Sequence, residues 1–152
     1  MIGEILNVFG QVLLDPMALS LSVLGVLLGI ILGALPGVSS TMSLAVLLPI
    51  SFSMSPAHAM MFLLGIFSAS VYGGSISAIL INIPGTPGAI ITQMDGYPMA
   101  RNGRAGEALT YALFASTFGG VLGWMMLVVC APLVADAALH FQSPEYAAVT
   151  FF

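Results

Sequence analysis

An apolar stretch of the sequence is interrupted by residues whose types and order could bind an anion. Within GALPGVSSTM, residues 33–42, Pro36 and Gly37 break a regular helix. Three consecutive hydroxyl residues then follow: Ser39, Ser40 and Thr41. A helix that begins near Ser39 leaves its first backbone N–H groups unpaired and presents about +0.5 of an elementary charge at its open end. These residues therefore predict an anion site that needs no charged side chain.

A second interruption has the composition of a cation site. NIPGTPG, residues 82–88, contains the breaker pair Pro84 and Gly85. The amide of Asn82 and the hydroxyl of Thr86 lie on either side of that pair. A helix that ends here leaves carbonyl oxygens without backbone partners, and such oxygens suit a sodium ion. We predict a cation site at Asn82 and Thr86. For both interruptions, the alternative is a kink that only adjusts packing.

The composition indicates that a bilayer surrounds the chain. Hydrophobic residues make up 59% of it and charged residues 5%, with a mean hydropathy of +1.11. A soluble domain carries about 25% charged residues. No Asp, Glu, Lys or Arg occurs between Asp15 and Asp95, as several membrane spans would require. The net charge of −4 and the presence of only two arginines exclude a basic nucleic-acid surface.

Apolar runs and breakers predict an all-helical membrane protein with about three full spans and one short helix. Residues 1–15 have the periodicity of an amphipathic helix lying in the membrane interface and ending at Asp15-Pro16; the alternative is a first turn that leads into the next span. The expected order is a span over 17–35, a short helix over 39–50, a span over 56–83, an irregular segment over 84–103 and a span from 105 to about 132. Ser55 is expected to cap the helix that begins at Pro56.

Small residues repeat every four positions in the first span. Gly25, Gly29 and Gly33 share one helical stripe, which predicts a face where another backbone approaches closely. His58 is interpreted as an interfacial histidine, because no acid or second histidine lies near it in the sequence. Ser75, in YGGSIS, has no nearby base to activate it, so we predict that the chain is not an enzyme.

Three segments resemble the large membrane subunit of tripartite tricarboxylate transporters, the TctA family. They are LGALPGVSSTMSLAVLLPISF, YGGSISAILINIPGTPGAIITQMDGYPMARNGRAGEAL and SPEY. The resemblance runs from about Leu24 to Tyr146, which is roughly the opening third of a family member. Val38 and Ser39 depart from the usual leucine and glycine. Gly88 and Gln93 fall in a variable part of the second motif, so the substrate stays open.

The resemblance implies a multi-pass secondary transporter of the bacterial inner membrane, built from two inverted repeats with discontinuous helices. Its expected partners are a small membrane subunit and a periplasmic solute-binding protein. Its substrates would be citrate, related tricarboxylates or other organic acids. A sodium or proton gradient would drive their uptake. Residues 16–152 would then be the N-terminal part of the first transmembrane repeat, truncated at the C-terminus. The alternative is an accessory membrane subunit, or a fragment, without its own transport site.

The resemblance implies a specific ligand for each of the two interruptions. The carboxylate substrate is expected at the first: Pro36, Gly37, Ser39, Ser40 and Thr41. The cation or the far end of the substrate is expected at the second: Asn82, Pro84, Gly85 and Thr86. No cofactor is expected beyond a sodium ion at Asn82 and Thr86.

Overall fold

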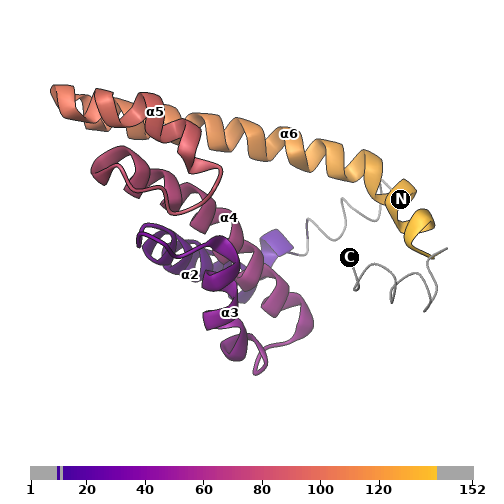
Figure 1. Cartoon of the computed structure of the whole chain (residues 1–152). Helices are drawn as coiled ribbons and strands as arrows, with labels where there is room; N and C mark the ends of the chain where they lie inside the picture. Colours follow the sequence, from indigo (N-terminus) through magenta and orange to yellow (C-terminus); the bar gives the residue numbers. More distant parts are fainter. Residues whose placement is uncertain (1–9, 11, 140–152) are drawn as a thin grey trace, which may run out of the picture. The chain divides into compact units, whose positions relative to one another are not determined.

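The computed structural model describes residues 10 and 12–139, and every regular element in that part of the chain is a helix (Figure 1). The elements are α2 (Pro16–Gly33), α3 (Ser40–Ser51), α4 (Pro56–Ile81), α5 (Ala89–Met99), the short turn η1 (Ala100–Arg104) and α6 (Ala105–Leu139). The predicted interfacial helix over residues 1–15 lies mostly outside the described residues. The chain divides into two units, Met1–Leu113 and Phe114–Phe152, and α6 runs from the first into the second.

Within the described residues, three helical segments are long and apolar enough to cross a membrane. They are Pro16–Gly33, Pro56–Ile81 and Ala89–Ala131. The third is divided by Gly103, whose φ of 78° separates α5 from α6. Large apolar side chains face outward, such as Ile31 with 60% exposure. The predicted class, an all-helical integral membrane protein, agrees with this architecture.

Glycines hold α2 and α4 together in a parallel pair. A Cβ at Gly25 would meet the backbone of Phe62, and one at Gly29 would meet that of Ile66. Residue numbers on the two helices rise together along the contact, so the helices run in the same direction. From the other side, Gly65 of α4 lies against the backbone of α2. The predicted packing stripe is therefore confirmed, and its partner is α4.

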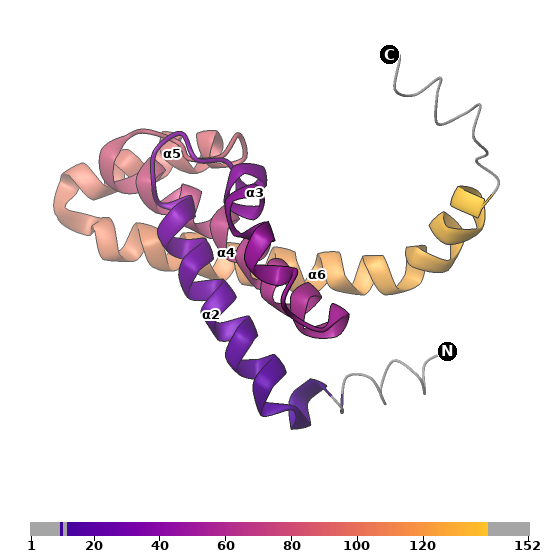
Figure 2. The ribbon, with the colours of Figure 1, turned by 90° about the horizontal axis from the view of Figure 1, so that it is seen from below.

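The short helix α3 follows α2 in the sequence and carries the chain back toward the start of α4, so that the two longer helices can run in the same direction. It covers Ser40–Ser51, close to the predicted 39–50, and runs back along α2 in Figure 2. Ser43 is fully buried, whereas Val46 and Ile50 are exposed. An apolar groove of about 430 Å³ separates α3 from α4, where Leu44 and Leu48 face Met60 and Phe67. The outward apolar surface of α3 suits lipid or other membrane helices better than water.

The prediction of an irregular segment over residues 84–103 is wrong for most of its length, because α5 occupies Ala89–Met99. Gly96 does not break this helix but lets it pack closely, since a Cβ there would meet the side chain of Ile79. Pro98 lies next to the C-terminal end of α5. A proline there removes the backbone hydrogen bond to the carbonyl four residues earlier, and the helix forms despite that loss. The irregular parts are residues 82–88 and the kink at Gly103.

His58 has an acidic partner that its sequence neighbourhood does not reveal. Its Nε2 lies 2.8 Å from Oδ2 of Asp15, across the ends of α2 and α4. Asp15 also caps α2, because its Oδ1 accepts from the N–H of Met17 at 2.9 Å. The expectation that no acid accompanies His58 is therefore wrong. This pair marks one polar end of the α2/α4 pair.

The contact between Asp15 and His58 predicts a pH-dependent contribution to the stability of the fold. The hydrogen bond from His58, and then that from Met17, lower the pKa of Asp15 below 3.8. A carboxyl whose pKa is lower in the folded state stabilises the fold above its unfolded pKa, and this gain is lost as pH falls through the folded value. We expect the Tm advantage of wild type over Asp15→Asn to be constant above about pH 5 and to shrink below about pH 4. Asp95→Asn should not reproduce this trend, because Asp95 has no hydrogen bond or ion pair with a described residue.

Candidate functional site

The segment after α4 folds back into the protein instead of leaving it. Asn82 ends α4 in the left-handed conformation, with φ of 61°, which turns the chain sharply. Gly85 then lies buried beside the C-terminal part of α4, and its N–H points to the carbonyl of Gly74 at 3.4 Å. The second interruption is therefore a re-entrant loop, residues 82–88, packed on α4.

Three glycines bring the two interruptions together. A Cβ at Gly85 would lie 2.7 Å from the carbonyl oxygen of Gly33 and 2.9 Å from Cα of Gly74. Gly33 ends α2, just before the first interruption. Side chains at these positions would force the backbones apart. We call Gly33, Gly74 and Gly85 the glycine junction; it joins the end of α2, the C-terminal part of α4 and the re-entrant loop.

Thr86 is the most unusual polar residue at the junction. It is 8% exposed, and its buried Oγ1 has no hydrogen-bond partner among the residues that the structure describes. Its side chain lies directly on Gly74, where a Cβ would be 2.9 Å from Oγ1. An unpaired buried hydroxyl costs about 1–3 kcal/mol, so native structures seldom keep one without a reason.

Asn82 already uses its oxygens in this structure. Nε2 of Gln93, on α5, lies 2.8 Å from the backbone oxygen of Asn82 and 2.7 Å from its Oδ1. The amide nitrogen is thus held between two oxygens of one residue. Asn82 and Thr86 consequently differ: the first is exposed and paired, and the second is buried and unpaired.

The first interruption forms an open helix start. Gly37 has φ of 83°, a conformation that favours glycine. The exposed Pro36 precedes it. Ser39 is the N-cap of α3, and its Oγ accepts from the N–H of Met42 at 3.2 Å. Ser39 is thus occupied as a cap. Within the described residues, the N–H groups of Ser40 and Thr41 have no acceptor, so this end can still bind an anion.

Charged groups lie outside these two interruptions. Nη2 of Arg104 is 2.6 Å from Oε2 of Glu107, so these two neutralise each other. Neither arginine pairs with Asp95. No group of three His, Cys, Asp or Glu side chains that could hold a metal occurs in the described part of the chain. Any ligand at the junction would meet hydroxyls, amides and backbone dipoles.

Sequence reasoning missed the α4 side of this site. Gly74 receives the re-entrant loop, and Ser77 donates its hydroxyl to the Gly74 carbonyl at 3.1 Å. Gln93, which holds Asn82, falls in a variable part of the second motif and is not among the predicted site residues. The adjacent glycines of YGGS, residues 72–75, were a usable signal, because two consecutive small residues can pack against two different neighbours.

Comparison with known proteins assigns the family. The sequence profile described as "Tripartite tricarboxylate transporter TctA family" matches residues 19–152. The chain belongs to this family. The TctA match includes both interruptions and the whole glycine junction.

One relative is a protein of Agrobacterium vitis described as "Uncharacterized 52.8 kDa protein in TAR-I ttuC' 3'region". It is 46% identical over 136 residues, which cover 90% of this chain and 27% of the relative. The chain thus spans about a quarter of that protein's length. No solved structure matches the chain.

Proposed function

We propose that this chain belongs to the membrane subunit of a secondary transporter that imports carboxylates into a bacterial cell across the inner membrane. A periplasmic binding protein would deliver the substrate, a small membrane subunit would complete the complex, and a sodium or proton gradient would drive uptake. The observation that carries the proposal is the glycine junction. It joins two uncharged helix breaks inside an apolar, TctA-family helix assembly, as in transporters that bind ions at broken helices.

The substrate carboxylate is assigned to the start of α3. The unpaired N–H groups of Ser40 and Thr41 and the hydroxyl of Ser40 supply donors, while Ser39 keeps the helix start in shape. Pro36 and Gly37 shape the turn that leaves this end open. An anion bound there gains from the helix dipole without a buried arginine. α3 would act in this way as one half of a discontinuous helix.

The coupling cation is assigned to the re-entrant loop. The buried hydroxyl of Thr86 lacks a partner among the described residues, and the loop bends at Pro84 and Gly85 beside the carbonyl of Gly33. Oxygen ligands of this kind suit sodium. Asn82 would bind the ion only after Gln93 releases the two oxygens of Asn82. The same loop could also receive the far end of a long substrate.

The test measures uptake and binding by a full-length transporter containing this segment, together with its binding protein and small membrane subunit. Ser40→Ala should weaken carboxylate binding by about 10-fold to 150-fold, because a hydrogen bond to a charged group contributes about 1.5 to 3 kcal/mol. Asn82→Ala should shift the sodium or pH dependence of uptake more than the substrate preference. Labelled citrate, other tricarboxylates and dicarboxylates form the substrate panel.

The matched control is Asp95→Asn, which removes an exposed carboxylate that has no described partner. It should cost under about 1 kcal/mol in binding. Unchanged affinities in Ser40→Ala and Asn82→Ala, together with transport abolished by Asp95→Asn, would refute the assigned sites. Uptake that is normal in all three variants would favour an accessory role for this segment.

A further inference from the structure

The turn between α5 and α6 contains both of the chain's arginines, and they differ in their partners. Lysine and arginine together number only 2 in the sequence. Arg104 binds Glu107 through two contacts, Nη2 to Oε2 at 2.6 Å and Nε to Oε1 at 3.1 Å. Arg101 has no hydrogen bond or ion pair with any residue that the structure describes. Among the described residues, the Arg101 side chain is therefore the cation of this turn that has no anionic partner.

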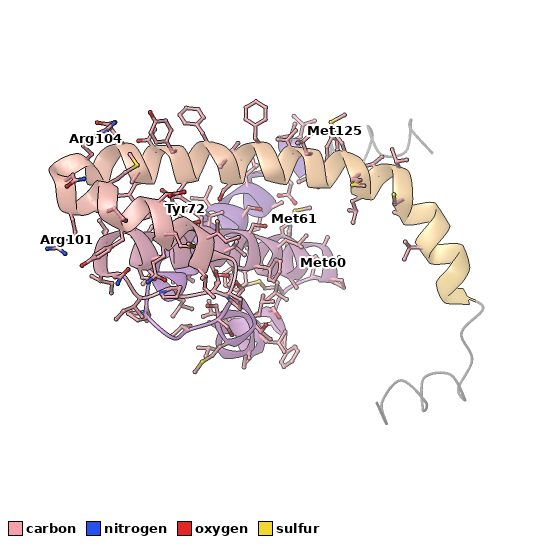
Figure 3. The ribbon with its side chains drawn as sticks, turned by 45° about the horizontal axis from the view of Figure 1, so that its top comes forward. Met60, Met61, Tyr72, Arg101, Arg104 and Met125 are labelled. Carbon is pink, nitrogen blue, oxygen red and sulfur yellow. The ribbon has the colours of Figure 1, made fainter. Side chains whose placement is uncertain are left out.

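Arg101 borders a recess with hydrogen-bond donors. The recess measures about 400 Å³ and is lined by Tyr97, Pro98, Arg101 and Asn102. In Figure 3, Arg101 and Arg104 project from the same turn in different directions. The lining offers a guanidinium, an amide and a phenol, and no carboxylate. This donor set fits a phosphate, which a guanidinium can bind through two parallel hydrogen bonds.

The recess lies next to apolar surface of the kind that faces lipid. On α5, Ile91 is 75% exposed and Met94 is 71% exposed. On α6, Tyr111 is 62% exposed and lies about two turns beyond Arg104. The left-handed Gly103 reverses the chain between these helices. A charged turn that follows such surfaces belongs at the headgroup level of a bilayer, where tyrosines also collect.

We propose that the Arg101 recess binds the phosphate of an anionic phospholipid headgroup. The uncompensated guanidinium supplies the attraction, and Tyr97 and Asn102 supply further donors. The neighbouring apolar side chains of α5 contact the acyl chains of the same lipid. Basic recesses beside membrane helices bind anionic headgroups in this way. A soluble phosphate has the same charged group but would gain nothing from the apolar surface.

The experiment compares lipid retention by arginine variants of the full chain. Protein is reconstituted in nanodiscs of phosphatidylcholine with or without phosphatidylglycerol, and native mass spectrometry counts retained lipid. Arg101→Gln should retain about 10-fold less phosphatidylglycerol than wild type, the effect of one lost charge-assisted contact. Arg101→Lys should retain an amount of phosphatidylglycerol between those of wild type and Arg101→Gln, because lysine keeps the charge and lacks the paired donors.

The matched control is the double variant Arg104→Gln/Glu107→Gln, which removes the neighbouring ion pair without changing the net charge. It should retain phosphatidylglycerol like wild type. Equal retention by Arg101→Gln and wild type would overturn the proposal. Binding of inorganic phosphate alone to lipid-free protein, lost in Arg101→Gln and without lipid preference, would identify a soluble anion instead.

Discussion

Replacing Gly29 by leucine should prevent α2 and α4 from packing and should leave little folded protein. A Cβ at Gly29 would lie 2.9 Å from both Cα of Ile66 and Cβ of Ala69. The obstacle is largely backbone, which cannot rotate aside as a side chain does. Overpacking of a tight contact costs about 1–3 kcal/mol or more, and we expect the upper end here. Thermal unfolding of the detergent-purified chain and its yield as a monodisperse peak measure the loss.

The same change at Gly106 is the control for Gly29→Leu. Gly106 lies in the first turn of α6, and a Cβ there meets nothing within 4 Å. Leucine is also the better helix former, by about 0.8 kcal/mol. Gly106→Leu should therefore match or exceed wild-type stability. If both variants unfold at the same temperature, α2 and α4 are not held by this glycine contact.

Replacing Thr86 by valine should abolish most transport and leave the fold intact. Valine has nearly the same shape and lacks only the hydroxyl, whose Oγ1 has no partner in the structure. Removing an unpaired buried hydroxyl should leave stability unchanged or raise it by about 1–3 kcal/mol. If the hydroxyl binds the cation or substrate, affinity should fall by about 10-fold to 150-fold. Uptake by the full-length transporter and the Tm of the same protein separate the two effects.

Thr86→Ser is the companion variant, because it keeps the hydroxyl and removes the methyl group. It should retain transport but lose about 1 kcal/mol of stability, since the methyl packs against Gly74. A purely structural role for Thr86 predicts the opposite pattern. In that case the valine variant would transport normally and the serine variant would show the larger overall defect.

Features encoded by local spacing could be predicted from the sequence. The stripe of Gly25, Gly29 and Gly33 follows a four-residue period, so its shared face follows from helix geometry alone. Helix starts were equally local. Ser55 accepts from the N–H of His58 at 3.4 Å, as expected of an N-cap before Pro56.

Features that depend on distant contacts could not be predicted. The re-entrant loop is defined by Gly85 meeting Gly33 and Gly74, residues that the sequence does not link. Asp15 and His58 are 43 positions apart, and only the parallel packing of α2 and α4 brings them together. Gly96 and Pro98 resemble breakers in sequence, but packing on Ile79 keeps that segment helical. In each case tertiary contact outweighs local preference.

The parallel arrangement of α2 and α4 constrains how a ribosome-bound chain enters the membrane. Two spans that run in the same direction can be joined only if the chain crosses the bilayer again between them. α3 makes most of that crossing with 12 residues, about 18 Å of helix against a hydrocarbon core of about 30 Å. A translocon that selects segments by length and hydrophobicity would release α3 poorly. We therefore expect α3 to stay at the headgroup level until α4 is synthesised. The helices α2, α3 and α4 would then insert into the bilayer as one unit.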